Sequence, residues 1–262
     1  MTEGTLIVKT SKFKTFTTQL RRSFTVTKKD LRIYYNKPPV LIQGILFPII
    51  LFIALTVGRS VQPIYLISGL MAMIIFLSST SIGPIVFPWE TMRKTFERLV
   101  TCPVSIKTIL LGSAWSSFIY GASFSSIPLI LGMLFLSIPL SINFILLIVG
   151  IILAGFAFSC FSLILSVPST DTPGNTMVLT ILIKFPIIFI SPLFMEIMVS
   201  PIIFISPLTY FVDLVDVGLG NSSAFGLFGV LIDIGFLLFF GFVSLFLAFK
   251  LHGKTLERRF RG

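Results

Sequence analysis

The sequence predicts an all-α integral membrane protein with six transmembrane helices. Hydrophobic residues make up 55% of the 262 residues, and the mean hydropathy is +1.03; a soluble domain of this size could not bury so much apolar side chain. Several apolar runs approach or exceed the roughly 20 residues that a helix needs to cross about 30 Å of hydrocarbon. These runs lack the alternating pattern of a membrane β-barrel, so we expect helices, which satisfy their backbone hydrogen bonds internally.

A basic segment precedes the first apolar run. Residues 1–39 contain nine Lys or Arg residues against only Glu3 and Asp30, and we expect them to form a cytoplasmic leader. Within residues 24–37, Phe24, Leu31 and a tyrosine fall near one helical face while the basic residues fall elsewhere. This pattern predicts an amphipathic interfacial helix before span 1 that ends at Pro38-Pro39. A disordered basic tail is the alternative, which we favour for residues 1–20.

The expected spans form a transmembrane domain at residues 40–249, followed by a basic cytoplasmic tail at 250–262. They are residues 40–57, with a kink at Pro48, and 64–87, 108–136, 142–167, 177–194 and 225–249. With both termini cytoplasmic, 18 of the 20 Lys and Arg residues lie on the cytoplasmic side, as the positive-inside rule requires.

Residues 197–212 are apolar but are not expected to cross the membrane. Pro201 and Pro207 interrupt these 16 residues, and Asp213 and Asp216 follow them. The segment is too short and too broken for a comfortable span, and a crossing would place the basic tail outside. We therefore predict re-entrant or short external helices between spans 5 and 6.

A polar island, residues 88–107, separates spans 2 and 3. Its charged residues are Glu90, Arg93, Lys94, Glu97, Arg98 and Lys107. On one continuous helix the first five would share a face, with Glu90 and Glu97 placed to pair with Lys94 and Arg93. Met92, Phe96 and Leu99 would form an apolar stripe opposite. This pattern favours a cytoplasmic helix that docks a partner; an ordinary solvated connection is the alternative.

Residues that could carry catalysis or hold a cofactor are scarce. Gly253-Lys254-Thr255 matches the end of a phosphate-binding loop, but Ala248 occupies the position where that loop needs a further glycine. His252 is the only histidine. We expect no ATP, metal or other cofactor bound directly by this chain and no enzymatic activity of its own. Because the positive charge flanks the spans, we also expect membrane lipid rather than nucleic acid as a partner.

Asp213 and Asp216 could suggest a metal pair, as in membrane enzymes that act on phospholipid headgroups. Two acids without a further acid or histidine nearby make an incomplete set of ligands. We therefore interpret them as acids of a solvated loop. A membrane enzyme would instead lose its activity when either acid is replaced.

Two ionisable residues fall inside predicted spans. Lys184 lies in span 5 and Asp233 in span 6, and each costs roughly 2.5–3.5 kcal/mol at a helix centre, so such residues tend to face a cavity, a partner or a pathway. Lys184 could instead extend to the cytoplasmic interface, whereas Asp233 is too short to reach as far. A direct Lys184–Asp233 pair is a hypothesis. An ion-coupled carrier or channel using these two residues without ATP is the alternative function.

The polar island resembles a segment of the membrane subunit of type-2 ABC (ATP-binding-cassette) exporters. That family characteristically has a Glu, a Gly-Thr-x-Glu-x-Leu segment, a Pro-Val or Pro-Ile, and a Leu-rich start of span 3 with a Gly. The matching residues here are Glu90, Thr95, Glu97, Leu99, Pro103, Val104 and the run from Ile109 to Gly112. Ser206-Pro207-Leu208-Thr209-Tyr210 is similar to a second family segment. Lys94 departs from the pattern, because Gly is usual there.

The resemblance implies a permease subunit that dimerises in the cell (plasma) membrane and binds two copies of a separate cytoplasmic ABC ATPase. ATP and Mg would be used by that ATPase. A hydrophobic or amphipathic substrate, such as a drug, a lipid or a lipid-linked glycan, would be moved outward. The residues expected to couple the permease to the ATPase are Glu90, Arg93, Lys94, Thr95, Glu97, Arg98 and Pro103.

Overall fold

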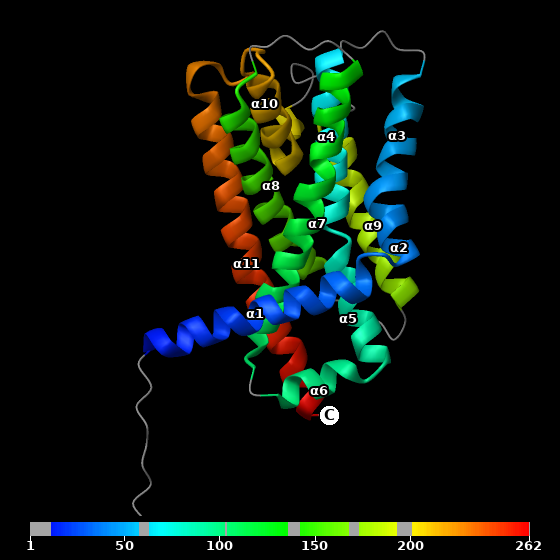
Figure 1. The fold of residues 1–262 in the computed structure, drawn as a ribbon, viewed down its shortest axis with the longest axis vertical. Helices are drawn as coiled ribbons and strands as arrows, with labels where there is room; N and C mark the ends of the chain where they lie inside the picture. Colours follow the sequence, from blue (N-terminus) through cyan, green and yellow to red (C-terminus); the bar gives the residue numbers. More distant parts are fainter. Residues whose placement is uncertain are drawn as a thin grey trace, which may run out of the picture.

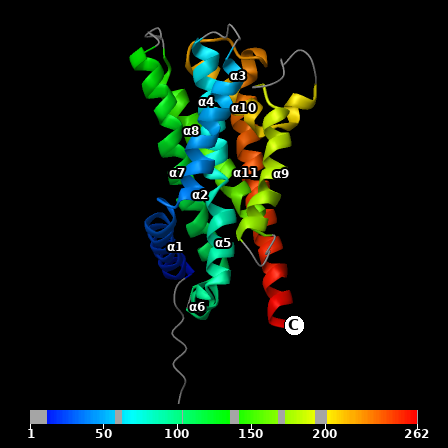
Figure 2. The ribbon, with the colours of Figure 1, turned by 90° about the vertical axis from the view of Figure 1, so that its right-hand side faces the viewer.

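The computed structural model describes residues 12–57, 63–102, 104–135, 142–167, 173–192 and 201–261. These ranges form helices and turns and contain no strand, which confirms the all-α prediction. The long helices run side by side, while α1 (Lys12–Tyr34) lies across one end of the bundle (Figures 1 and 2). The end of the last helix lies at the same end of the bundle as α1 (Figure 1).

The helices follow the predicted spans closely. After α1 come α2 (Pro38–Leu41), the π-helix η1 (Ile42–Leu46), α3 (Phe47–Thr56), α4 (Pro63–Ser79), α5 (Ile82–Met92), α6 (Thr95–Thr101), α7 (Ile106–Phe135), α8 (Phe144–Leu165), α9 (Pro173–Phe189), the 3-10 helix η2 (Pro201–Ile205), α10 (Pro207–Gly218), the 3-10 helix η3 (Gly226–Phe228) and α11 (Gly229–Arg261). The expected boundary between span 6 and the tail lies inside α11.

Within the described residues, four helical segments are long and apolar enough to cross a membrane. They are Tyr65–Met92, Ile106–Leu134, Phe144–Leu165 and Gly226–Thr255. Shorter apolar helices, Pro38–Leu51 and Gly174–Phe189, occupy the positions of predicted spans 1 and 5.

The first apolar helix contains a wide turn just before Pro48. In η1 the Phe47 N–H donates to the Ile42 carbonyl, and a wide turn of this kind is a usual response to a proline that lacks its own N–H. The turn also carries Gly44, where an added Cβ would lie 2.8 Å from Tyr120 Cε1. The irregularity expected at Pro48 therefore lies in the preceding turn, which packs closely against α7.

The second span is the central helix of the bundle and is interrupted. In the most apolar 18-residue stretch of the Tyr65–Met92 segment, 94% of the residues are buried, so protein surrounds that stretch on nearly all sides. α4 ends at Ser79 and α5 begins at Ile82. Side-chain hydroxyl groups donate hydrogen bonds to backbone carbonyls beside the break. Thr80 donates to the Phe76 carbonyl at 2.6 Å, and Ser81 donates to the Leu77 carbonyl. Such bonds compete with the helical ladder and favour a bend or interruption.

α10 lies at the opposite end of the bundle from α6 (Figure 1). Its 12 residues span about 18 Å, too little to cross about 30 Å of hydrocarbon, which agrees with the predicted short helices. The prediction of solvated acids is wrong, because α10 inserts between α4, α8 and α11 and buries Asp213 and Asp216. Asp213 accepts hydrogen bonds from the Ser223 hydroxyl at 2.6 Å and the Ala224 N–H at 2.7 Å.

Candidate functional site

The polar island forms two helices joined by a tight turn. α5 ends at Met92, and Lys94 adopts a left-handed conformation with φ of 56° before α6 begins at Thr95. The predicted continuous helix with one charged face is therefore wrong. The reason is local: the N–H groups of Arg93 and Lys94 bond back to the carbonyls of Trp89 and Thr91, which closes the helix and turns the chain. The expectation that residues three or four positions apart share a helical face does not hold across such a turn.

Lys94 occupies a conformation that suits glycine. A left-handed conformation costs a residue with a Cβ roughly 1–2 kcal/mol. We expect Lys94→Gly to stabilise the folded protein by about 1 kcal/mol, which raises the thermal unfolding midpoint by about 3 °C. Lys94→Ala is the matched control, because it removes the charge but keeps the Cβ and should bring no such gain. An equal gain from both variants would show that charge, rather than backbone strain, limits stability here.

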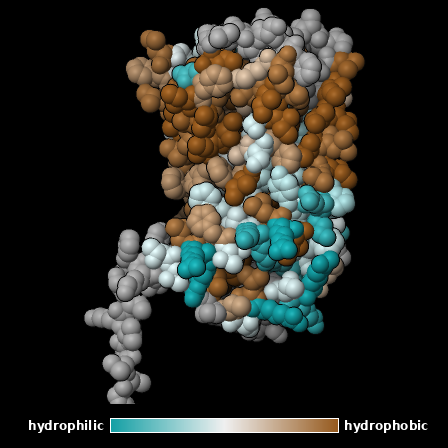
Figure 3. All heavy atoms as spheres, in the orientation of Figure 1, coloured by the Kyte–Doolittle hydropathy of each residue, from teal (hydrophilic) through white to brown (hydrophobic). Residues whose placement is uncertain are grey.

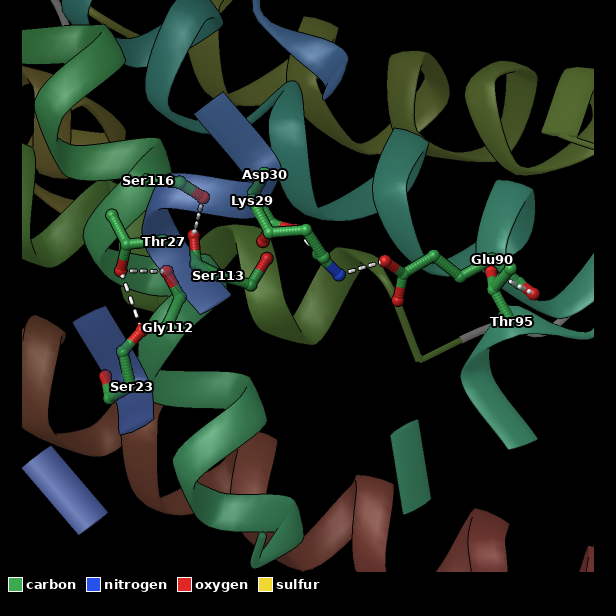
Figure 4. A network of polar contacts seen from close by, with 9 residues as sticks. All are labelled: Ser23, Thr27, Lys29, Asp30, Glu90, Thr95, Gly112, Ser113 and Ser116. Carbon is green, nitrogen blue, oxygen red and sulfur yellow. Dashed lines mark hydrogen bonds and ion pairs between the residues drawn. The ribbon is translucent and has the colours of Figure 1, made fainter. Parts of the chain in front are cut away.

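Glu90 pairs with a different helix from the one expected. Its side chain is buried and forms an ion pair with Lys29 of α1 (Figure 4), instead of pairing with Lys94. The Thr95 hydroxyl donates to the Glu90 carbonyl at 3.2 Å, which joins α6 to the end of α5. The Arg93 guanidinium lies 4.9 Å from the centre of the Trp89 ring. Arg98 is exposed, while Pro103 and the side chain of Glu97 lie outside the described part.

A second acid completes this cluster on α1. One Asp30 carboxylate oxygen lies 3.1 Å from the Lys29 ammonium, and the side chain is 1% exposed. Burial raises the pKa of Asp30 to about 7, although the Lys29 charge lowers it. Lys29 thus holds two buried carboxyl groups, one on its own helix and one at the end of the central helix.

α1 is fixed on α7 by a close crossing. The Thr27 hydroxyl donates to the Gly112 carbonyl at 2.9 Å, and the Thr108 hydroxyl donates to the Gln19 side-chain carbonyl at 2.7 Å. A Cβ on Gly112 would lie 2.6 Å from Val26 Cβ, so only glycine permits this approach. The buried face of α1 is made by Ser23, Val26, Thr27, Asp30 and Tyr34.

The outer surface of α1 carries both apolar and basic residues. Leu20, Phe24 and Ile33 are exposed, as are Arg21, Lys28 and Arg32, and the Phe24 ring stacks on Trp115 of α7 with ring centres 5.8 Å apart. This arrangement suits a helix that lies in the membrane interface, since one face meets the bundle and another meets lipid.

α6 packs against the bundle through Leu99. Leu99 packs against a cluster that includes Phe87 of α5, Leu110 of α7, Leu163 of α8 and Ala248 of α11. Figure 3 shows hydrophilic residues gathered at this end of the molecule, below a hydrophobic middle. The site is therefore a polar end face that includes α1, the end of α5 and α6.

Lys184 and Asp233 lie in separate surroundings. Lys184, 2% exposed, lies on a cavity of about 380 Å³ between the first apolar helix, α4 and α9. Asp233 on α11 is fully buried and interacts with Asp213 of α10. The structure does not form the hypothesised Lys184–Asp233 pair.

Sequence reasoning missed the part played by Lys29, Asp30 and Gly112 in this site. The sequence separation of Lys29 and Glu90 is 61 residues, so no local spacing could connect them. The only available signal was Asp30 itself, a lone acid in a strongly basic helix.

Comparison with known protein families decides the identity of the chain. The model of the ABC-2 type transporter family matches residues 21–219, which run from within α1 to the end of α10. The chain belongs to this family. The ABC-2 permease is a multi-pass membrane protein and a transport subunit that lacks an ATPase. Permeases of this kind generally pair with ABC ATPase subunits. A comparison with curated proteins finds no match.

Proposed function

We propose that this ABC-2 permease is the membrane subunit of an exporter that moves a hydrophobic or amphipathic substrate outward. Two copies of the permease would form a dimer in the plasma membrane and bind two cytoplasmic ATPase subunits. ATP and Mg would bind the ATPase. The leader (residues 1–39) and the tail (250–262) would lie in the cytoplasm on either side of the transmembrane domain (40–249).

Six crossings of the membrane are supported by the direction of the helices. The first apolar helix, α4–α5, α7, α8, α9 and α11 alternate in direction, and α1 and the end of α11 lie at the same end (Figures 1 and 2). The basic residues of α1, of the α5–α6 turn and of α11 lie toward this end, and the positive-inside rule favours placing it in the cytoplasm.

The observation that carries the proposed coupling is the position of α6. This helix joins the central helix to α7, its Leu99 packs against the buried cluster, and Arg98 on it and Met92 just before it are exposed. A partner that binds here contacts a segment continuous with the central helix and, through Glu90, with α1. To drive transport, the ATPase must bind one conformation of the permease better than the other.

Arg98→Glu tests this proposal. We expect the variant to lose most of the stimulation that the permease gives to its ATPase, because it reverses an exposed charge on the proposed docking helix. The measurement is ATPase activity of the co-purified complex in lipid vesicles. Lys250→Glu, which reverses an exposed charge on α11, is the control and should keep the stimulation. Full stimulation in Arg98→Glu would contradict docking at α6.

An ion-coupled carrier is less well supported. It would need Lys184 and Asp233 on one pathway, whereas these residues lie in separate surroundings. Their roles in translocation stay proposals, and Lys184 is the better placed of the two.

A further inference from the structure

The cavity beside Lys184 combines an apolar wall with the side chain of a buried lysine. Phe47 of α3, Leu77 of α4 and Phe185 of α9 contribute to the wall, together with Gln43 of the π-helix. Phe47 and Phe185 meet edge to face, with ring centres 5.7 Å apart. At about 380 Å³, the volume falls within the range typical of small-molecule sites.

Lys184 has no charge partner in the part of the chain that the structure describes. The ion pairs found there both involve Lys29, and Lys184 is 2% exposed. An uncompensated cation buried among apolar groups is costly, so such residues in membrane proteins usually serve a ligand or a pathway. Gln43 lies on the same cavity and offers an amide that can donate to an oxygen.

We propose that this cavity binds a single-chain amphiphile with an anionic head, a carboxylate or a phosphate, as the transported substrate. The head is neutralised by Lys184 and accepts a hydrogen bond from Gln43, while the chain lies against Phe47, Leu77 and Phe185. The volume lies at the lower end of the range for ligand sites, which favours one alkyl chain over a two-chain phospholipid. That the occupant is the exported substrate rests on the function proposed above; the binding itself does not.

The test uses the full-length permease, without ATPase, in phosphatidylcholine nanodiscs. The probe is a single-chain alkyl phosphate that carries a photoactivated diazirine, and labelled peptides are mapped by mass spectrometry. We expect saturable labelling of α9 or the first apolar helix. Decyl phosphate should block the labelling at a concentration about tenfold or more below that of decanol, because a charge-assisted contact is lost with the alcohol.

Substitutions at Lys184 test the role of the cation. Lys184→Met should abolish the preference for decyl phosphate over decanol, and Lys184→Arg should keep it, which also shows that the site folds when the residue is changed. Lys250→Met, the same change at an exposed lysine, should behave as wild type. Equal competition by decanol in the wild type, or an unchanged preference in Lys184→Met, would overturn the proposal.

Bulk lipid is the competing source of an anionic head. Replacing a fifth of the phosphatidylcholine by phosphatidylglycerol should leave the labelling intact, and loss of labelling would identify the occupant as ordinary lipid and overturn the proposal. A failure of the proposed ATPase coupling would appear only in the ATPase assay, so the two proposals fail separately.

Discussion

Replacing Lys29 by methionine is expected to destabilise the folded permease by about 3 kcal/mol, because it leaves the buried Glu90 carboxylate without a cation. Glu90 is 3% exposed and lies near the end of the central helix, so its charge depends on the ammonium group for most of its stabilisation. The thermal unfolding midpoint of the purified permease should fall by about 10 °C. Figure 4 shows that this one lysine joins α1 to α5.

Two further variants isolate the ion pair. The double variant with Lys29→Met and Glu90→Gln should recover much of the loss, since the remaining amide carries no charge. Lys28→Met, the same change at an exposed neighbour, should alter stability by less than about 0.5 kcal/mol. If the double variant were as unstable as the sum of its single changes, the pair would not be the source of the stability.

Asp30 is expected to make the stability of the permease fall as the pH rises from about 4 to about 7. Its pKa is raised to about 7 in the folded protein by burial, whereas an unfolded aspartate has a pKa near 3.9. Between these values the folded state holds a proton that the unfolded state has released, so the free energy of unfolding decreases with rising pH. The loss amounts to about 4 kcal/mol above pH 7.

Asp30→Asn should remove this pH dependence. The amide resembles the protonated acid, so the variant should match the wild type near pH 4 and exceed its stability at pH 8. The measurement is the unfolding midpoint of both proteins from pH 4 to pH 8. Other titrating groups are common to the two, so the difference between the curves reports Asp30. Parallel curves would show that Asp30 is ionised throughout the range.

Hydrophobic patterning predicted the helices well because membrane spans depend mainly on length and apolar content. Residues 108–136 and 142–167 correspond closely to α7 and α8. The polar island was harder to predict, because helical spacing does not reveal a single left-handed residue. The family likeness did carry that information: glycine is usual at position 94, where the chain turns with a positive φ.

Tertiary contacts explain the other features that could not be predicted from the sequence. Asp213 follows an apolar, proline-containing segment and gives no local sign that Ser223 and Ala224 will donate to it. The buried face of α1 consists largely of small and polar residues such as Ser23 and Thr27, which hydrophobic periodicity does not mark as a packing face. In both cases the burial of the residues depends on which helix packs against them, and the periodicity of the sequence does not show which helix that is.

The helical hydrogen-bond ladder is interrupted at Thr80 and Ser81, so a bend of the central helix would be centred there. α5 is about 16 Å long, so a tilt of about 10° at the break moves its α6 end by about 3 Å while α4 stays in place. Glu90 lies about 12 Å along α5 from the break, so the same tilt would shift it by about 2 Å and lengthen its ion pair with Lys29 toward the roughly 4 Å limit. The Lys29–Glu90 contact would thus be tighter in one orientation of α5 than in another, so the attachment of α1 to α5 would change with the tilt.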